Sequence, residues 1–389
     1  MVWSNLQRRQ AFCTSKYRSV DQRQCLSRKI MELKVDEEIL KAYGFTSTTI
    51  KLQQIGSGHI NRTYLLLTED GDKYVLQRLN TSVFTQPHLI ASNLKKVSNE
   101  LTSRYPFYLF PAPLPTKNGD LLATVEKEHW RLLPFVADAI SFDALSDPKQ
   151  AYEAAKQFGK LTRLLDKFDT STLKPTIQRF HDLNLRYQQF IEATEQAQSH
   201  LKEFSANEIK NAISLKSIVQ DYTYHLNNPD FPDRVIHHDT KISNVLLNEE
   251  DHTGVCVIDL DTLMGGKYIS DVGDMMRTYL CEFSEDEKDL GKIKIRLPYF
   301  KATISGYLSE MAIILTPTEK KLILFSGKFI IYMQALRFLT DYLNGSVYYP
   351  ISYDEHNLDR AKNQFKLLSE LFKNEDTLQS IIDECLLSV

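Results

Sequence analysis

Hydrophobic and polar residues follow two different periods along this chain. In the first third, short apolar or alternating runs lie between turn-forming residues, a pattern that predicts strands. We expect these strands at residues 50–55, 63–68, 74–79, 121–125 and 129–133. From Asp147 onward, apolar residues recur every three to four positions, which is typical of helices that bury one face. The helices predicted there span residues 148–166, 179–203, 206–226, 291–313, 317–344 and 357–386.

The order of these elements divides the chain into two parts. Further helices are expected at residues 35–43 and 87–102, on either side of the first three strands. Residues 133–136 begin at the end of the last predicted strand and are expected to form a hinge. We therefore predict an α+β fold with two lobes. A small antiparallel-sheet lobe would occupy residues 31–134, and a mostly helical lobe residues 135–389.

The composition narrows the possible partners. Hydrophobic residues make up 42% and charged residues 25% of the chain, as in an ordinary globular protein. A net charge of −3 argues against nucleic acid as the main partner, because no basic excess exists to neutralise phosphates. No uninterrupted apolar stretch approaches the ~18 residues of a membrane span, and Ile323–Tyr332 is expected to be a buried helix. The 5 cysteines show no C-x-x-C motif, which favours a reducing, cytoplasmic location without disulfides or zinc.

Residues 1–30 form a basic segment whose only acid is Asp21. Such a composition resembles an organelle transit peptide. The alternatives are a disordered tail or an extension upstream of a start at Met31, and we favour one of these. The segment has no apolar core of the kind that a secretion signal requires.

A set of polar residues after two apolar runs suggests chemistry. Asp239 and Asn244 follow the run at residues 234–236, and Asp259 ends a second run at residues 255–258. In phosphoryl transfer, one carboxylate orients the acceptor hydroxyl and takes its proton, while an Asn and a second Asp hold Mg²⁺ against a nucleotide triphosphate. The order and spacing of these residues match that plan.

Neighbouring residues have two interpretations each. Asp261 is a candidate second metal contact or a structural residue of the turn. Lys241 is a candidate partner of the terminal phosphate or a solvated lysine. Between the first two strands, Gly56, Ser57, Gly58 and Asn61 would place backbone amides against nucleotide phosphates or simply form a turn. Their position between two strands disfavours a dinucleotide site, and no P-loop sequence occurs in the chain.

With these residues the chain resembles the aminoglycoside phosphotransferase/choline kinase-like superfamily, and within it the N-acetylhexosamine 1-kinases. The motifs that carry the resemblance span residues 55–61, 75–84, 130–135, 180–182, 238–244, 258–264, 273–274, 337–343 and 356–358. The resemblance implies that Asp239 is the catalytic base and that Asn244 and Asp259 are magnesium ligands. It also implies ATP as the phosphoryl donor.

The same resemblance implies an acceptor site for a small molecule. His59, Arg337 and Tyr348 would be sugar contacts. The alternative for His59 is a turn residue, and for Arg337 an ion pair with Asp341 one helical turn away. His181 would either point at the acceptor or belong to a helix start.

The chain departs from the kinase pattern on the nucleotide side. Gln77 stands where a phosphate-binding lysine is usual, and Arg78 is the nearest cation. The helix after the third strand has no internal glutamate to pair with such a lysine, since Glu100 lies at its end. Residues 265–271 also depart from the family pattern, on the acceptor side. Further nucleotide contacts are expected at the hinge, from Pro134, Phe135 and Val136.

We therefore expect an ATP- and Mg²⁺-dependent kinase that phosphorylates the anomeric hydroxyl of an N-acetylhexosamine. Two alternatives stay open. The acceptor could instead be another small alcohol, such as an aminoglycoside, a choline-like alcohol or an amino-acid alcohol. The missing lysine also admits a nucleotide-binding protein without catalysis, against which the intact set of Asp239, Asn244 and Asp259 argues.

Overall fold

The computed structural model describes residues 35–55 and 61–389 of the chain. The predicted basic tail and the turn residues Gly56, Ser57, Gly58 and His59 lie outside these ranges. Residues Glu37–Val389 form one compact unit, and its first element is α1 (Glu37–Tyr43).

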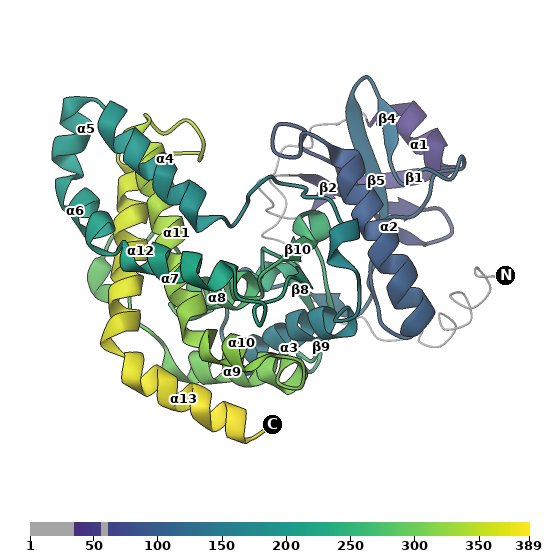
Figure 1. The fold of residues 1–389 in the computed structure, drawn as a ribbon. Coiled ribbons are helices and arrows are strands. Elements are labelled where there is room, and N and C mark those ends of the chain that lie inside the picture. The colour runs from purple at the N-terminus through teal and green to yellow at the C-terminus, as the bar shows by residue number, and fades with distance from the viewer. Residues whose placement is uncertain (1–34, 56–60) are drawn as a thin grey trace. The chain divides into compact units, whose positions relative to one another are not determined.

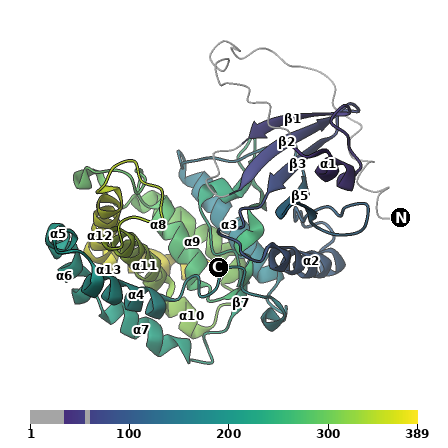
Figure 2. The same ribbon diagram turned by 90° about the horizontal axis from the view of Figure 1, so that it is seen from above.

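An antiparallel sheet occupies the first part of this unit. Its strands, in spatial order, are β1 (Ile50–Ile55), β2 (Arg62–Thr68), β3 (Lys73–Arg78), β5 (Glu128–Pro134) and β4 (Ala123–Val125). Figure 2 shows β1, β2, β3 and β5 side by side in this order. Gly71, in the turn between β2 and β3, has a φ of 86°, which glycine adopts without strain. The predicted antiparallel sheet is confirmed.

The register of β3 decides which of its side chains face the rest of the protein. Gln77 lies opposite Thr63 of β2 and Arg131 of β5. Successive side chains of a strand point to opposite faces, so Gln77 and Arg78 face opposite sides of the sheet. Between β3 and β4 lies α2 (Pro87–Arg104), whose buried Asn93 donates hydrogen bonds to carbonyl oxygens of the helical part.

Helices dominate the remainder, as predicted. They are α3 (Pro148–Leu164), α4 (Leu183–Gln196), α5 (Ser199–Phe204), α6 (Ala206–Ser214), α7 (Ser217–Leu226), α8 (Ile269–Tyr279), α9 (Leu297–Met311), α10 (Pro317–Lys321), α11 (Ile323–Leu343), α12 (His356–Lys373) and α13 (Glu375–Leu387). In the packed core, α3 lies against α9, and α11 lies against α4, α8 and α12 (Figure 1). The expected α+β, protein-kinase-like fold is confirmed.

The central helix, α11, has the length and apolar composition of a membrane span. However, 72% of its most apolar stretch is buried inside the protein, so its composition is explained by the core that it fills. This agrees with the predicted buried helix at Ile323–Tyr332.

Several predicted helices are shorter than expected or are divided into two. The helix predicted from residue 179 begins only after Asp182, whose carboxylate accepts a hydrogen bond from the backbone N–H of Leu185. The segments 206–226, 317–344 and 357–386 are each divided into two helices. The sequence pattern missed α8 altogether, because Asp271 and Asp274 are buried and interrupt its apolar periodicity.

Two small sheets frame the loops that carry the candidate catalytic residues. One pairs β7 (Arg234–Ile236) with β10 (Met264–Gly266), and the other joins β6 (Ala139–Ile140), β8 (Val245–Asn248) and β9 (Gly254–Val257). The apolar runs predicted before Asp239 and Asp259 are therefore strands β7 and β9. The predicted boundary between the lobes falls at the end of β5 and stays a prediction.

Glycines allow α3 and α9 to pack closely. A Cβ at Gly306 of α9 would overlap the backbone carbonyl of Tyr152 on α3, and one at Gly159 of α3 would lie 3.0 Å from the carbonyl oxygen of Tyr307. Helix backbones can approach to this distance only where no side chain intervenes.

We predict that Gly306→Ala lowers the free energy of unfolding by about 1–3 kcal/mol, as overpacking in a core does. This loss would outweigh the roughly 0.5–1 kcal/mol that alanine gains over glycine within a helix. Chemical denaturation would measure the change, with Ser309→Ala, an exposed position on the same helix, as the control. Stabilisation by Gly306→Ala would mean that the two helices can move apart without cost.

Candidate active site

The loop between β7 and β8 brings the predicted base and a predicted metal ligand into contact. Asn244 donates from Nδ2 to the backbone carbonyl of Asp239 at 2.8 Å and to its Oδ2 at 3.0 Å. Lys241 lies beside them, with its Nζ 3.1 Å from Asp239 Oδ2. The structure therefore brings Asp239, Lys241 and Asn244 together, as their spacing in the sequence predicts.

The surroundings of Asp239 favour its charged form. Burial alone would raise the pKa of this carboxyl. The charges of Lys241 and His237, together with hydrogen bonds from Lys241 and Asn244, outweigh burial and hold the pKa of Asp239 below its usual value. At neutral pH the carboxylate is therefore ionised, and it can orient a hydroxyl group and accept its proton.

Two carboxylates of α8 hold the backbone of this loop. Asp271 accepts hydrogen bonds from the N–H groups of His237 at 2.9 Å and His238 at 2.7 Å. Asp274 accepts one from the N–H of Thr240 at 2.7 Å. These contacts fix the residues on both sides of Asp239. Sequence reasoning missed this role, although acids three residues apart can share one helix face and gave a signal.

A metal could be held next to this loop. Asp259 follows β9 with a left-handed backbone conformation, φ 56° and ψ 54°. The amide of Ile258 donates to the carbonyl oxygen of Asn244 at 2.8 Å, which aligns the two segments. Within the described residues, neither the Asp259 carboxylate nor Oδ1 of Asn244 accepts a side-chain or backbone hydrogen bond. Hard oxygen atoms without protein partners are the ligands that Mg²⁺ prefers, so the residues fit such an ion.

The charge around Asp259 supports the same conclusion. Loss of hydration among the surrounding protein atoms, and then the negative charges of Asp261 and Asp239, raise the pKa of Asp259 to about 7. A divalent cation would offset this repulsion. No group of three or more His, Cys, Asp or Glu that could hold a metal occurs in residues 35–55 and 61–389. Nucleotide phosphates and water would therefore have to complete the ion's coordination.

Asp261, a predicted metal contact, is held by protein groups. One carboxylate oxygen forms a buried ion pair with Arg131 of β5, and the other accepts a hydrogen bond from Asn61 Nδ2 at 2.7 Å. Both oxygens are thus occupied by protein donors. Among the predicted metal ligands, Asn244 and Asp259 are those whose side-chain oxygen atoms have no hydrogen-bond donor in the described residues, and the metal contact of Asp261 stays a prediction.

The predicted nucleotide contacts lie in different environments. Gln77 donates to Thr63 Oγ1 at 3.0 Å and accepts from Arg131. Arg78, the cation nearest to that position in the sequence and a predicted nucleotide contact, pairs with Glu128 at 2.9 Å. The side chains of Arg78 and Glu128 are partly exposed. They lie on the face of the sheet opposite to the one that holds Gln77 and Arg131.

The remaining predicted nucleotide contacts lie at the end of β5, in the segment that follows it, and before β2. Pro134 ends β5, and Lys73 Nζ lies 5.2 Å from the ring centre of Phe135. Val136 follows in the connecting segment. Of the glycine-rich turn only Asn61 is described, and its Oδ1 accepts a hydrogen bond from the backbone N–H of Asn80.

A cavity of about 390 Å³ lies beside the catalytic loop. Its volume falls within the range of about 300–1,000 Å³ that is usual for small-molecule sites. Its lining includes Phe180, His181, His238, Met264 and Lys267. The ring of His181 stacks on Phe180 and lies 5.4 Å from the ring of His238, between centres. His181 therefore lies beside the cavity rather than capping a helix, a role that belongs to Asp182.

The predicted contact Arg337 lies next to the same aromatic residues. Its guanidinium carbon is 5.7 Å from the ring centre of Phe180 and 6.0 Å from that of Tyr348. Asp341 does not pair with it, because the Asp341 carboxylate accepts backbone hydrogen bonds from residues 347–349 and one from Asn357. The ion pair that was the alternative interpretation of Arg337 is thus absent.

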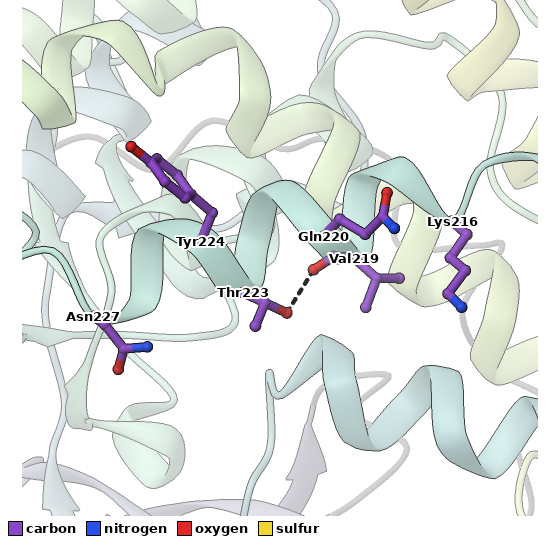
Figure 3. A pocket seen from close by; sticks show the side chains of 6 residues that line it. All are labelled: Lys216, Val219, Gln220, Thr223, Tyr224 and Asn227. Carbon is purple, nitrogen blue, oxygen red and sulfur yellow. Dashed lines mark hydrogen bonds between the residues drawn. The ribbon is translucent and has the colours of Figure 1, made fainter.

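A second hollow lies along α7 and has a different character. Figure 3 shows its lining side chains, which all come from this helix and its ends: Lys216, Val219, Gln220, Thr223, Tyr224 and Asn227. None of them is an acid, and only Lys216 is charged. A hollow with this lining offers no group for proton transfer.

The family comparison agrees with this geometry. Residues 51–293 match the family described as the phosphotransferase enzyme family. The chain belongs to this family. The expected membership of the aminoglycoside phosphotransferase/choline kinase-like superfamily is thereby confirmed, and the chain is a phosphotransferase by family. The narrower resemblance to N-acetylhexosamine kinases stays a prediction.

Solved structures of this phosphotransferase fold are similar over most of the chain. A microcompartment-associated aminopropanol kinase has 18% identity and a TM-score of 0.59, over 88% of this chain and 97% of its own. A spectinomycin phosphotransferase in complex with ADP and spectinomycin has 14% identity and a TM-score of 0.55, over 87% and 97%. Choline kinase from Cryptosporidium parvum Iowa II has 16% identity and a TM-score of 0.52, over 88% and 95%. At these identities the similarity shows the fold alone.

We predict that Asp239→Asn lowers kcat by about 10²–10⁴-fold, the usual contribution of a positioned base, while ADP binding is retained. Steady-state kinetics and calorimetric titration with ADP would measure the two effects. Asp251→Asn, in the exposed turn between β8 and β9, should leave both unchanged. More than about a tenth of the wild-type kcat in Asp239→Asn would remove Asp239 from this role.

A second prediction concerns the buried Asp271. Burial is the largest influence on its carboxyl and raises the pKa of Asp271 to about 6. The folded protein then binds this proton more tightly than the unfolded chain, so the contribution of Asp271 to stability falls as pH rises from about 4 to about 6. The amide side chain of Asn does not gain or lose a proton between pH 4 and pH 7, so this contribution is missing from the Asp271→Asn variant. The stability difference between wild type and Asp271→Asn should therefore shrink over this pH range.

Denaturation of both proteins between pH 4 and pH 7 would measure this difference. Asp354→Asn, at an exposed position, serves as the control and should track the wild type. A difference that grows with pH would show that the folded state prefers the charged carboxylate of Asp271.

Proposed function

We propose that this phosphotransferase uses ATP and Mg²⁺ to phosphorylate the anomeric hydroxyl of an N-acetylhexosamine. The observation that carries the proposal is the charge of the acceptor side. Two arginines, Arg186 of α4 and Arg337 of α11, lie there without an ion-pair partner among the residues that the structure describes. Burial and repulsion from Arg337 lower the pKa of Arg186, which places the two cations close together.

Polar groups next to Arg337 would also interact poorly with a positively charged ligand. Nε of Arg186 and Nδ1 of His181 are buried, and no described residue forms a hydrogen bond with either atom. Burial and the charges of neighbouring cations hold the pKa of His181 well below its ordinary value. The cavity itself is lined by aromatic rings, by the imidazoles of His181 and His238, and by two carboxylates, Asp182 and Asp233, which are paired with Arg179 and Lys267.

This charge pattern separates the candidate acceptors. Aminopropanol and choline carry a positive charge, which Arg186 and Arg337 would repel. A neutral hexose presents many hydroxyl groups, and its acetamide carbonyl can accept a hydrogen bond from an arginine. Aromatic rings such as Phe180 and Tyr348 offer flat surfaces to the apolar face of a sugar. These features support a sugar over an amino alcohol.

In the proposed reaction the protein mainly positions groups and neutralises charge. Asp239 would orient the acceptor hydroxyl and receive its proton. Lys241, held by Asp239, would face the transferring phosphoryl group. Asn244 and Asp259 would hold the magnesium ion, which when bound neutralises the charge of the phosphates. The close contact of these groups also argues against the alternative of a nucleotide-binding protein without catalysis.

The direct test is ATP consumption with a panel of acceptors. N-acetylglucosamine and N-acetylgalactosamine should be phosphorylated, and their methyl glycosides should not react, because the anomeric hydroxyl is blocked. Choline and aminopropanol should be poor acceptors. Phosphorylation of a methyl glycoside at the rate of the free sugar would refute the 1-kinase proposal, and preference for choline would refute a sugar acceptor.

We predict that Arg337→Ala weakens turnover of the N-acetylhexosamine by roughly 5- to 150-fold, the cost of about 1–3 kcal/mol for one buried hydrogen bond. ATP affinity should stay within a few-fold of the wild type. Arg104→Ala, an exposed arginine of α2, serves as the matched control and should behave as the wild type. Equal losses for sugar and ATP would show that Arg337 supports the fold rather than the acceptor.

A further inference from the structure

Kinases of this fold type usually have a phosphate-binding lysine on the third strand. In this sheet a buried cation lies beside that position, on the neighbouring strand. Gln77 occupies that position of β3, and Arg131 lies directly opposite on β5. The Arg131 guanidinium donates to Gln77 Oε1 from Nε at 2.8 Å and from Nη2 at 2.5 Å. Its Nη1 donates to Asp261. The glutamine side chain thus turns the neighbouring arginine toward the turn that follows Asp259.

Burial separates Arg131 from the other cations of the sheet. Its side chain is 3% exposed, and so is that of its partner Asp261. Among the lysines and arginines on the described strands β1–β5, Arg131 is the only buried one. Arg78 is turned to the opposite face and pairs with Glu128.

The contacts of Arg131 also connect the elements that would surround a triphosphate. Asp261 lies two residues beyond the candidate metal ligand Asp259. Its other oxygen binds Asn61, which ends the glycine-rich turn. An arginine has five N–H donors, and the contacts with Gln77 and Asp261 use three of them. The donors that remain belong to a planar group, whose geometry suits phosphate oxygens.

We infer that Arg131 is the cation that binds the nucleotide phosphates in this protein, with Asp261 as its ion-pair partner. The positive charge comes from β5 instead of β3, and Gln77 directs it. This role rests on the proposed use of ATP, and it answers how the phosphates are held without the usual lysine. It makes no assumption about the acceptor.

The test is the affinity for ADP compared with adenosine, measured by calorimetry with Mg²⁺ and without acceptor. Arg131→Met keeps an unbranched, largely apolar side chain and removes the guanidinium group with its charge. We expect it to weaken ADP binding at least ten-fold and to leave adenosine binding within two-fold, because adenosine has no phosphates. The matched control is Arg78→Met on the opposite face of the sheet, which should change neither affinity.

A second variant separates phosphate binding from a structural role. Arg131→Met combined with Gln77→Lys returns a cation to β3, and ADP affinity should recover to within a few-fold of the wild type. Should Arg131→Met unfold because Asp261 is left unpaired, the pair Arg131→Met and Asp261→Asn removes both charges, and ADP binding should still be weakened relative to adenosine.

Three outcomes would overturn the inference. Wild-type ADP affinity in folded Arg131→Met would show that the phosphates are held elsewhere, while the proposed use of ATP would stand. Equal losses for ADP and adenosine would assign Arg131 to the fold alone. Wild-type protein that binds neither ligand would refute the proposed nucleotide use itself, and with it the role of Arg131.

Discussion

The active site depends on hydrogen bonds that hold the backbone of residues 237–240 from two sides. Carboxylates of α8 accept the N–H groups of His237, His238 and Thr240. Hydroxyl groups of Thr262 and Tyr279 donate to the carbonyl oxygens of His237 and Thr240. Buried backbone groups need such partners, and here side chains supply them because the loop belongs to neither helix nor strand.

These contacts explain an uncommon backbone conformation next to the candidate base. His238 has a φ of 67°, a left-handed conformation that costs a non-glycine residue of order 1–3 kcal/mol. It persists because Asp271 binds the N–H groups of His237 and His238 together. The bend turns the chain so that Asp239 meets Lys241 and Asn244. The position of the catalytic carboxylate is therefore set by α8, an element more than 30 residues further along the chain.

Much of the fold and part of the site could be predicted from the sequence. Strand and helix periods predicted the sheet and the helical part, and the spacing of Asp239, Asn244 and Asp259 predicted the candidate base and the candidate metal ligands. These features are local, because each depends on residues a few positions apart. The pairing of Arg131 with Asp261 joins positions 130 residues apart, and no local pattern specifies it. The same holds for Asp341, whose partners lie in the loop after its own helix.

The sequence leaves alternatives open where one residue type can serve two purposes. Asp261 follows Asp259 at a spacing that suits a second metal ligand, yet the buried Arg131 takes its charge. A buried charge without a partner is costly. The buried guanidinium of Arg131 on β5 therefore requires an acid next to it, and Asp261 supplies that acid. Arg78 and Gln77 are adjacent in sequence, and only the register of β3 shows which of them faces the site.

The distribution of charge then links the fold to the choice of acceptor. Carboxylates gather around the catalytic loop, where Asp239 and Asp259 face the positions proposed for a hydroxyl group and a metal ion. Arginines lie on the side proposed for the acceptor, where Asp341 accepts backbone N–H groups and forms no ion pair with Arg337. A cationic acceptor would be attracted to the first region and repelled from the second, so it would not be held in one orientation. A neutral acceptor with hydroxyl and carbonyl oxygens can satisfy both regions at once, with one hydroxyl directed at Asp239 and the other oxygens at the arginines.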